Sequence, residues 1–437
     1  MATLPTAIRS NSVQPGGNTQ LQPTPPTEVT PEIAALLDEL TPAVTKFRQA
    51  SSMQNVNLDT VTMAAGADAS IRIASVGIGV YTVTEYTGTF SLVNTAAAAQ
   101  VLDISPLFPW NVITNTSVGI NVGTVTYSAD GPAGLMVAAR ARRTVLRESP
   151  NAYGLASAMV RVTAGANVTL TYGTSFSLSG VASLSVAATS TGVLTVTWYS
   201  LEKLAYSLDS MIGGLPLQNN SVYATLTRRT APSLLGTDVN SPFYVTGGVP
   251  ATITATVSLQ IKTEYWYWGV PSDPALYAAM VTNSYQVLQQ TGLSTSSTGP
   301  GAITYNLPQN ELLIATHLFM NQGAQGAQSV VGLGQYEQII VQYNGGKVVP
   351  IAENQGRQRF RQYLVYGDDR QQVAGYAMWD GDDTSDEITD TDSSGWVDTY
   401  TAASPQLLLT LAGSVTTPVT YSVTRESIGQ AQVAVVG

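Results

Sequence analysis

The sequence predicts a mainly β protein in which one chain forms two jelly-roll β-barrels, with a few flanking helices and an amphipathic helix near the N-terminus. Apolar and polar residues alternate with a period of two over most of the chain after residue 52, most clearly at 253–267. Many short segments rich in β-branched residues are bounded by Gly, Pro, Asn or Asp, which indicates a sandwich or a jelly roll. A strand–helix–strand order occurs once in each half, at 193–227 and at 253–319, which suggests two similar barrels.

We therefore divide the chain into three parts. Residues 1–50 form an N-terminal arm with a helix, residues 51–240 the first jelly roll, and residues 241–437 the second. Residues 1–29 are rich in Pro, Thr, Gln and Gly, so they bury too little apolar area to offset the entropy lost on ordering. We expect a flexible or extended arm there.

The amphipathic helix is predicted at 30–49. Thr30 suits the N-cap and Pro31 the first helical position, while Pro42 kinks or restarts the helix. The apolar residues recur every three or four positions and form one stripe: Ile33, Leu36, Leu37, Leu40, Val44 and Phe47. This stripe can pack on its own barrel, or it can face a membrane or a neighbouring subunit, and both interpretations stay open.

The remaining elements follow from the same patterns. Besides 253–267 and 311–319, strands are predicted at 71–73, 76–84, 168–172, 193–199, 220–227, 339–343, 407–411 and 419–424. Helices are predicted at 200–212, which ends at Gly213-Gly214, and at 273–290, which Asp273 caps and Gly292 closes. A hairpin turn at Gly345-Gly346-Lys347 is expected to join 339–343 to 347–351.

The composition favours neutral surfaces. Only 11% of the residues are charged, and Thr, Ser, Asn, Gln and Gly replace the missing charges. Faces of this kind suit extensive lateral packing because few charges lose their water when they meet. A secreted β-rich protein with the same Ser/Thr bias is the alternative interpretation.

The charge balance and the absence of cysteine exclude several classes of protein. A net charge of −10 argues against broad binding of nucleic acid, so we expect no specific nucleic-acid partner. Without cysteine there are no disulfides, thiolate metal sites or cysteine nucleophiles. The first residues lack a secretory signal pattern, and no run approaches 18 apolar residues, so we expect a soluble product made in the cytoplasm.

The sequence carries little catalytic chemistry. His317 is the only histidine and lies in an apolar run, so a histidine zinc site is excluded and a Ser-His-Asp triad would depend on this one residue. No Gly-x-Ser-x-Gly elbow supplies a serine, and no complete phosphate-binding glycine motif occurs. We predict a satisfied, half-buried strand histidine, and no catalytic residue, cofactor site or metal site.

Carboxylates gather once, near the C-terminal end: Asp380, Asp382, Asp383, Asp386, Glu387, Asp390, Asp392 and Asp398. An EF-hand starting at Asp380 fails, because its sixth and twelfth positions are Ser385 and Thr391. We predict an exposed acidic loop. Adventitious calcium binding and the paired carboxylates of a β-sandwich polysaccharide hydrolase are the sharper alternatives.

Arginines and aromatic residues also gather. The arginine clusters are Arg140, Arg142, Arg143 and Arg147, and then Arg357, Arg359 and Arg361. They are interpreted as solvent-facing strand positions or partners of acidic residues, or alternatively as contacts with lipid headgroups or genome. Tyr265-Trp266-Tyr267-Trp268 presents aromatic residues on both faces of a strand end, which favours an interface or, alternatively, a sugar-binding platform.

The layout resembles that of tectivirus major capsid proteins. The resemblance begins at Leu194–Leu226, where Leu194–Ser207 runs on to Pro216–Leu226 as a strand, a helix and a strand that close the first barrel. It continues in the same order with the N-terminal helix at 30–49, the long strand and helix at 253–290, the strand ending at Asn321-Gln322-Gly323, and the strand pair 407–411 and 419–424. Residues 1–29 and 380–398 depart from it as additions.

The resemblance implies a double jelly roll of the adenovirus hexon lineage, from a tailless, membrane-containing bacteriophage. It implies homotrimers of pseudo-hexagonal outline that tile an icosahedral virion shell over an internal membrane. Neighbouring capsomers and minor capsid or vertex proteins would be the partners, with peripheral contact to the membrane through the N-terminal helix. The alternative from a different class is a carbohydrate- or receptor-binding jelly roll, such as a virion spike or an adhesin.

Overall fold

The computed structural model describes part of the chain. The described residues are 45–73, 76–120, 124–141, 160–171, 182–205, 214–217, 223–280, 284–294, 299–324, 329–330, 335–344, 347–348, 353–354, 375–381, 396–400 and 402–430. They are mostly β-strand, in agreement with the predicted fold class, and they form four sheets.

The first sheet has seven strands and is dominated by three long ones. Its order is β1 (Met53–Asn57), β16 (Ile253–Trp268), β4 (Ile78–Asn94), β11 (Ser190–Lys203) and β8 (Val160–Ala164), with β2 (Val61–Met63) beside β16 and β12 (Leu215–Pro216) beside β4. All its pairs are antiparallel. Alternate residues of β4 and β11 are buried, as expected for a sheet with one face on a core.

The second sheet has ten strands and runs through both halves of the chain. Its order is β20 (Ser329–Val330), β19 (Glu311–Gln322), β27 (Val419–Gln430), β17 (Ser284–Ser294), β7 (Thr124–Ala129), β6 (Ile113–Ile120), β13 (Ala224–Thr230) and β3 (Asp68–Ile73), while β24 (Tyr376–Asp380) and β25 (Val397–Asp398) pair with β19. The parallel pairing of β7 with β17 joins the two halves edge to edge.

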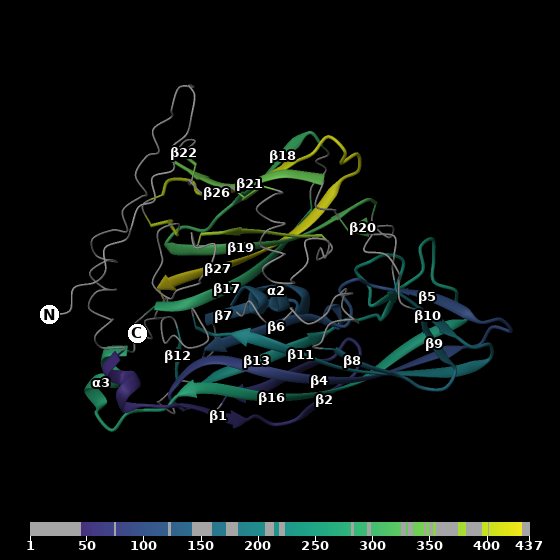
Figure 1. Ribbon diagram of the computed structural model, residues 1–437, viewed down its shortest axis with the longest axis horizontal. Helices are drawn as coiled ribbons and strands as arrows, with labels where there is room; N and C mark the ends of the chain where they lie inside the picture. The colour runs from purple at the N-terminus through teal and green to yellow at the C-terminus, as the bar shows by residue number, and fades with distance from the viewer. Residues whose placement is uncertain are drawn as a thin grey trace, which may run out of the picture.

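Two smaller sheets complete the layers. One contains β14 (Leu235–Gly236), β15 (Phe243–Tyr244), β5 (Gln100–Ile104), β10 (Ser183–Val186) and β9 (Val168–Thr171). The other contains β18 (Gly301–Asn306), β26 (Gln406–Leu411), β21 (Tyr336–Tyr343) and β22 (Lys347–Val348), with β23 (Glu353–Asn354) beside β21. In Figure 1 the first lies at the end of the molecule where β4 ends, and the second lies above β19 and β27.

Three short helical elements and the helical residues 45–50 accompany the strands. These elements are η1 (Trp110–Val112), α2 (Gly131–Ala141) and α3 (Pro274–Met280). The Asp130 carboxylate accepts the Ala133 backbone N–H at 2.8 Å, so it caps the start of α2. Helix α2 lies between the two halves of the molecule, and α3 lies at one end beside the helical residues that precede β1 (Figure 1).

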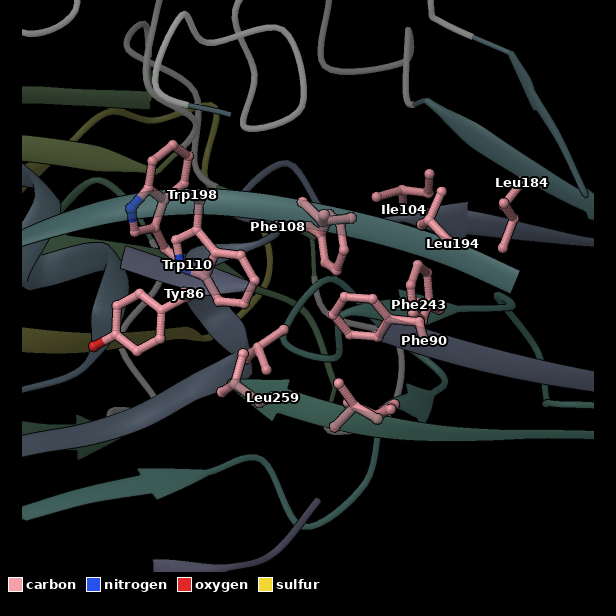
Figure 2. Close-up of a cluster of buried hydrophobic side chains, with 14 of the residues drawn as sticks. Tyr86, Phe90, Ile104, Phe108, Trp110, Leu184, Leu194, Trp198, Phe243 and Leu259 are labelled. Carbon is pink, nitrogen blue, oxygen red and sulfur yellow. The ribbon is translucent and has the colours of Figure 1, made fainter. Parts of the chain in front are cut away.

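Each half has its own apolar core. In the first, the Tyr86 and Trp198 rings stack at 5.1 Å, and Phe90, Phe108 and Phe243 contact one another (Figure 2). The second core lies between β19, β27 and the sheet of β21 and β26, around the fully buried Trp379 and residues such as Ile339, Leu409 and Val423. Two cores, each between two layers of sheet, give the two barrels that the sequence predicts.

Every predicted strand overlaps a strand of the described part of the chain, although β4 begins at Ile78 rather than at 76 and β13 at Ala224 rather than at 220, and β21 and β22 pair as the predicted hairpin requires. The helix prediction at 273–290 is wrong from residue 284. Asp273 does cap α3, through a 2.9 Å bond from the Ala275 N–H, but residues 284–294 form β17. This strand pairs with β27 over its whole length, and such tertiary pairing outweighs a helical periodicity in the side chains.

Two further expectations meet a different arrangement. Residues 200–203, which the sequence predicts as the beginning of a helix, are the end of β11, and residues 204–205 are not helical either; the rest of the predicted helix, 206–212, lies outside the described residues. The predicted domain division places β16 in the second jelly roll, yet this strand pairs with β4 across sixteen residues inside the first sheet. Its apolar residues complete the first core, which explains why it lies there.

Candidate functional site

Charged side chains are buried between the two halves of the molecule, and they form the most distinctive polar site among the described residues. Glu426 on β27 is fully buried. Its carboxylate accepts hydrogen bonds from Lys203 Nζ at 3.0 Å and from Arg140 Nη1 at 3.4 Å. Lys203 ends β11 in the first half and Arg140 lies on α2, so Glu426 connects to two elements that are more than 200 residues away in the chain.

A second acid and the histidine complete this site, which we call the inter-barrel ion network: Arg140, Lys203, His317, Tyr376, Asp380 and Glu426. Arg140 Nη2 donates to Asp380 Oδ1 on β24 at 2.8 Å, and both side chains are buried. His317 Nε2 lies 2.6 Å from Glu426 Oε1 and its Nδ1 lies 2.9 Å from the Tyr376 hydroxyl, so the ring joins both residues to the network.

The network keeps Glu426 ionised. Burial alone would raise the pKa of this carboxyl group, but the charges of Lys203 and Arg140 and the hydrogen bond from His317 outweigh burial. The pKa of Glu426 is therefore held well below its usual range. Removing one partner of a buried ion pair costs about 3–5 kcal/mol, because the other charge stays buried without compensation. The network thus fixes how the two halves are packed.

A related network lies inside the first barrel. The fully buried Arg228 on β13 donates to the Tyr86 hydroxyl at 2.9 Å, to Thr84 Oγ1 at 2.5 Å and to Glu202 Oε2 at 3.4 Å. Thr82 also donates to Glu202, at 2.5 Å. These bonds join the ten-stranded sheet to the seven-stranded sheet through the core. Both networks serve rigidity, because each locks two layers of sheet in one register.

His317 lies where the sequence predicts a satisfied strand histidine, on β19, although it is fully buried rather than half-buried. Its ring contacts are the buried Glu426 and the Tyr376 hydroxyl, and neither is a nucleophilic serine. Within the part of the chain that the structure describes, no group of three or more His, Asp or Glu is placed to hold a metal ion. No described helix is both long and apolar enough to cross a bilayer.

The predicted stripe of the N-terminal helix is described only at its end. Phe47 is fully buried against Ile78 and Tyr277, so at this position the stripe packs on its own chain. The other five members, Ile33, Leu36, Leu37, Leu40 and Val44, lie outside the described residues.

The acidic and arginine clusters predicted from the sequence are also described only in part. The sequence predicts Asp380 in an exposed acidic loop, but this residue is buried because Arg140 pairs with it. Arg140 itself is a buried partner of acidic residues, as one of the two interpretations proposes. Asp398 lies half-buried on β25, and the rest of both arginine clusters and of the acidic run lies outside the described residues.

The aromatic strand end is packed rather than open. Tyr265 is fully buried, and Trp266 stacks on Tyr81 with ring centroids 5.6 Å apart. Trp268 is partly buried beside the helical residues 45–50, where Arg48 lies 5.8 Å above its ring. This arrangement does not provide the flat exposed surface of a sugar-binding platform.

Sequence reasoning missed Lys203, Glu202 and Glu426 as members of these networks. The available signal was weak: charged residues stand where strands rich in β-branched residues continue, as in Glu202-Lys203 and Arg425-Glu426. Such positions require a buried partner, since charged side chains are rarely buried alone. The sequence does not say which partner, because the charges come together from distant strands.

Comparisons with known proteins give a fold. No protein-family model matches the sequence, and no curated protein matches it. Among solved structures, the STIV major capsid protein (MCP) superposes with a TM-score of 0.54 at 14% identity, covering 88% of this chain and all of that one. A chain from the atomic structure of Sulfolobus Turreted Icosahedral Virus gives a TM-score of 0.53 at 13% identity, over 87% of this chain and 91% of that one. The fold is therefore a double jelly roll, as the sequence predicts.

Proposed function

We propose that this chain is the major subunit of an icosahedral viral shell, located in the virion. The observation that carries the proposal is the double-jelly-roll fold, which matches the STIV MCP over the whole length of that protein. Two solved structures that this chain resembles come from a viral capsid and not from an enzyme, which supports a structural role. The likeness supports the shell role and not the spike or adhesin alternative.

The internal construction of the molecule supports the same role. A shell subunit must hold its shape so that many copies can pack side by side in one shell. Here a continuous ten-stranded sheet and the inter-barrel ion network join the two barrels. We further propose that the two functional units are the predicted jelly rolls at 51–240 and 241–437, with β16 donated by the second segment to the first barrel.

The assembly that we propose is a homotrimer. Three chains with two barrels each place six similar barrels around one axis, which gives a capsomer of pseudo-hexagonal outline. Neighbouring capsomers and minor capsid or vertex proteins would be its partners. The N-terminal helix, through Ile33, Leu36, Leu37, Leu40 and Val44, would approach an internal membrane or a neighbouring subunit, with Phe47 as its anchor on the barrel.

Purification and imaging of the full chain test this proposal. The molar mass from light scattering should be three times the chain mass of 46.0 kDa. Electron microscopy of the purified protein should show six barrels in each trimer. Imaging of virus particles should place this subunit in the shell. A chain that stays monomeric at every concentration, and that is present in only a few copies per particle, would contradict the proposal.

A further inference from the structure

The outer face of the seven-stranded sheet carries hydroxyl side chains in ordered rows. Because β16, β4, β11 and β8 pair in register, side chains on this face stand side by side. One row is Ser258, Thr89, Thr195 and Thr163. On one side of it lies the row of Gln260, Thr87, Thr197 and Arg161. On the other side lie two shorter rows, first Thr256, Ser91 and Val193, and then Thr254, Val93 and Thr191. We call these four rows the Ser/Thr face.

The face is open and nearly free of charge. Thr89, Thr254, Thr256 and Ser258 are exposed, and Val93 is 36% exposed. Arg161 is the one charged residue in the four rows, at their margin on β8. The next row toward the middle of the molecule holds Lys262 and Glu85, which pair with each other at 3.4 Å. The sheet lies on the side of the molecule away from β18, β21 and β26 (Figure 1).

The loop that follows β4 extends this neutral surface. Residues 95–99 are mostly exposed and uncharged, and Asn94 holds them in place. Its side-chain amide donates to the carbonyls of Ala98, Val186 and Ala187, and its Oδ1 accepts the N–H of Ala96. The surface is therefore ordered before it meets a partner, which lowers the entropy cost of binding.

We propose that the Ser/Thr face is a surface through which one copy of this chain contacts a second copy. This inference rests on the proposed shell function and locates one of its contacts. Chains that each carry a net charge of −10 repel one another, so identical copies meet most favourably across faces without charges. A hydroxyl group both donates and accepts, so the face can pair with any uncharged polar surface of the same chain.

The dimensions fit a contact of this kind. Rows repeat about every 6.7 Å and strands lie about 4.8 Å apart, so the four rows cover roughly 400 Å². A specific interface buries about 800 Å² on each partner. The Ser/Thr face therefore supplies about half of the area that one partner buries in such an interface. The adjoining loop 95–99 adds to that area. The stiff χ1 of threonine further reduces the side-chain entropy that is lost on contact.

The absence of cysteine gives a direct test in the full-length protein. Thr256→Cys introduces a single thiol into the Ser/Thr face. Thr114→Cys introduces one at an exposed threonine on β6, whose sheet already carries the charged residues Asp68 and Arg229 on its outer surface. We expect a maleimide reagent to label the Thr256→Cys thiol about tenfold more slowly in the oligomer than in dissociated chains, since the interface centre excludes water. The Thr114→Cys thiol should react equally in both.

Charge insertion gives a second readout. Thr256→Glu should lower the amount of oligomer by at least about tenfold, since burying an uncompensated carboxylate costs more than the ~1.4 kcal/mol that a tenfold change represents. Thr114→Glu should leave it unchanged, and circular dichroism should show both variants folded. If Thr256→Glu unfolds, Thr254→Glu at the end row replaces it. Equal labelling in both states, or an unaffected Thr256→Glu oligomer, overturns this inference while the shell function stands. A wild-type chain that never oligomerises overturns the shell function itself.

Discussion

Replacement of Glu426 by glutamine tests how the two barrels are held together. Glu426→Gln keeps the shape of the side chain but removes the negative charge that Lys203 and Arg140 share at 3.0 and 3.4 Å. Because Glu426 is fully buried, water cannot replace that charge. We expect the free energy of unfolding to fall by about 3–5 kcal/mol at neutral pH. Guanidinium denaturation of the full chain, followed by tryptophan fluorescence, measures this loss.

The pH dependence of the loss is a sharper criterion. The pKa of Glu426 is lowered in the folded protein, mainly by Lys203 and Arg140 against the effect of burial. Its contribution to stability is therefore fully present above the ordinary value of 4.5 and disappears as the pH falls toward the lowered folded pKa. The stability difference between wild type and Glu426→Gln should be constant near neutral pH and shrink below about pH 4.5.

Two comparisons separate the buried charge from general damage. Asp68→Asn breaks an ion pair with Arg229 that is largely exposed, and it should change stability far less. Adding Lys203→Met to Glu426→Gln also removes the cation that pairs with Glu426 and should restore part of the loss, with a coupling of about 0.5–3 kcal/mol. The reasoning would be refuted if Glu426→Gln costs no more than Asp68→Asn, or if the double variant shows no coupling.

Three further predictions concern the first barrel and the N-terminal helix. Trp198→Ala removes a fully buried ring that stacks on Tyr86, so denaturation should show a loss of about 3–5 kcal/mol. Asn94→Ala removes the donor to the carbonyls of Ala98, Val186 and Ala187 and the acceptor of the Ala96 N–H, which should cost about 1–3 kcal/mol and speed amide exchange at Ala96, while β27 keeps its protection. Leu36→Asp with Leu40→Asp should leave the melting temperature of the barrels unchanged but reduce particle formation; loss of soluble protein instead would place the stripe in the barrel core.

Several features of the fold could be predicted because they depend on local pattern. The alternation at 253–267 gives β16 directly, since one face of this strand packs on a core and the other meets solvent. The hairpin after β21 follows from its turn residues, and Asn344 adopts the left-handed conformation there, with φ of 52°. The single histidine and the absence of cysteine limit the chemistry that the chain can carry, because they exclude sites built from two histidines, thiolate metal sites and cysteine nucleophiles.

Other features depended on contacts that local pattern does not encode. Residues 284–290 fit a helical periodicity, but pairing with β27 and β7 makes them a strand. The helix α2 was missed, although Asp130 followed by Gly131-Pro132 was a possible start signal. The pairing of β16 with β4 could not be predicted either, because an alternating pattern identifies a strand but not the strands beside it.

The class of the fold, the alternation of its strands and the shortage of charge can all be predicted from the amino-acid sequence. These properties follow from residue type and spacing along the chain. The contacts of Glu426 with Lys203 and Arg140, and the rows of Thr and Ser from three distant segments on one face, become visible in the folded chain. Both arrangements join residues that are far apart in the chain, so strand pairing and layer packing, rather than local preference, place them together.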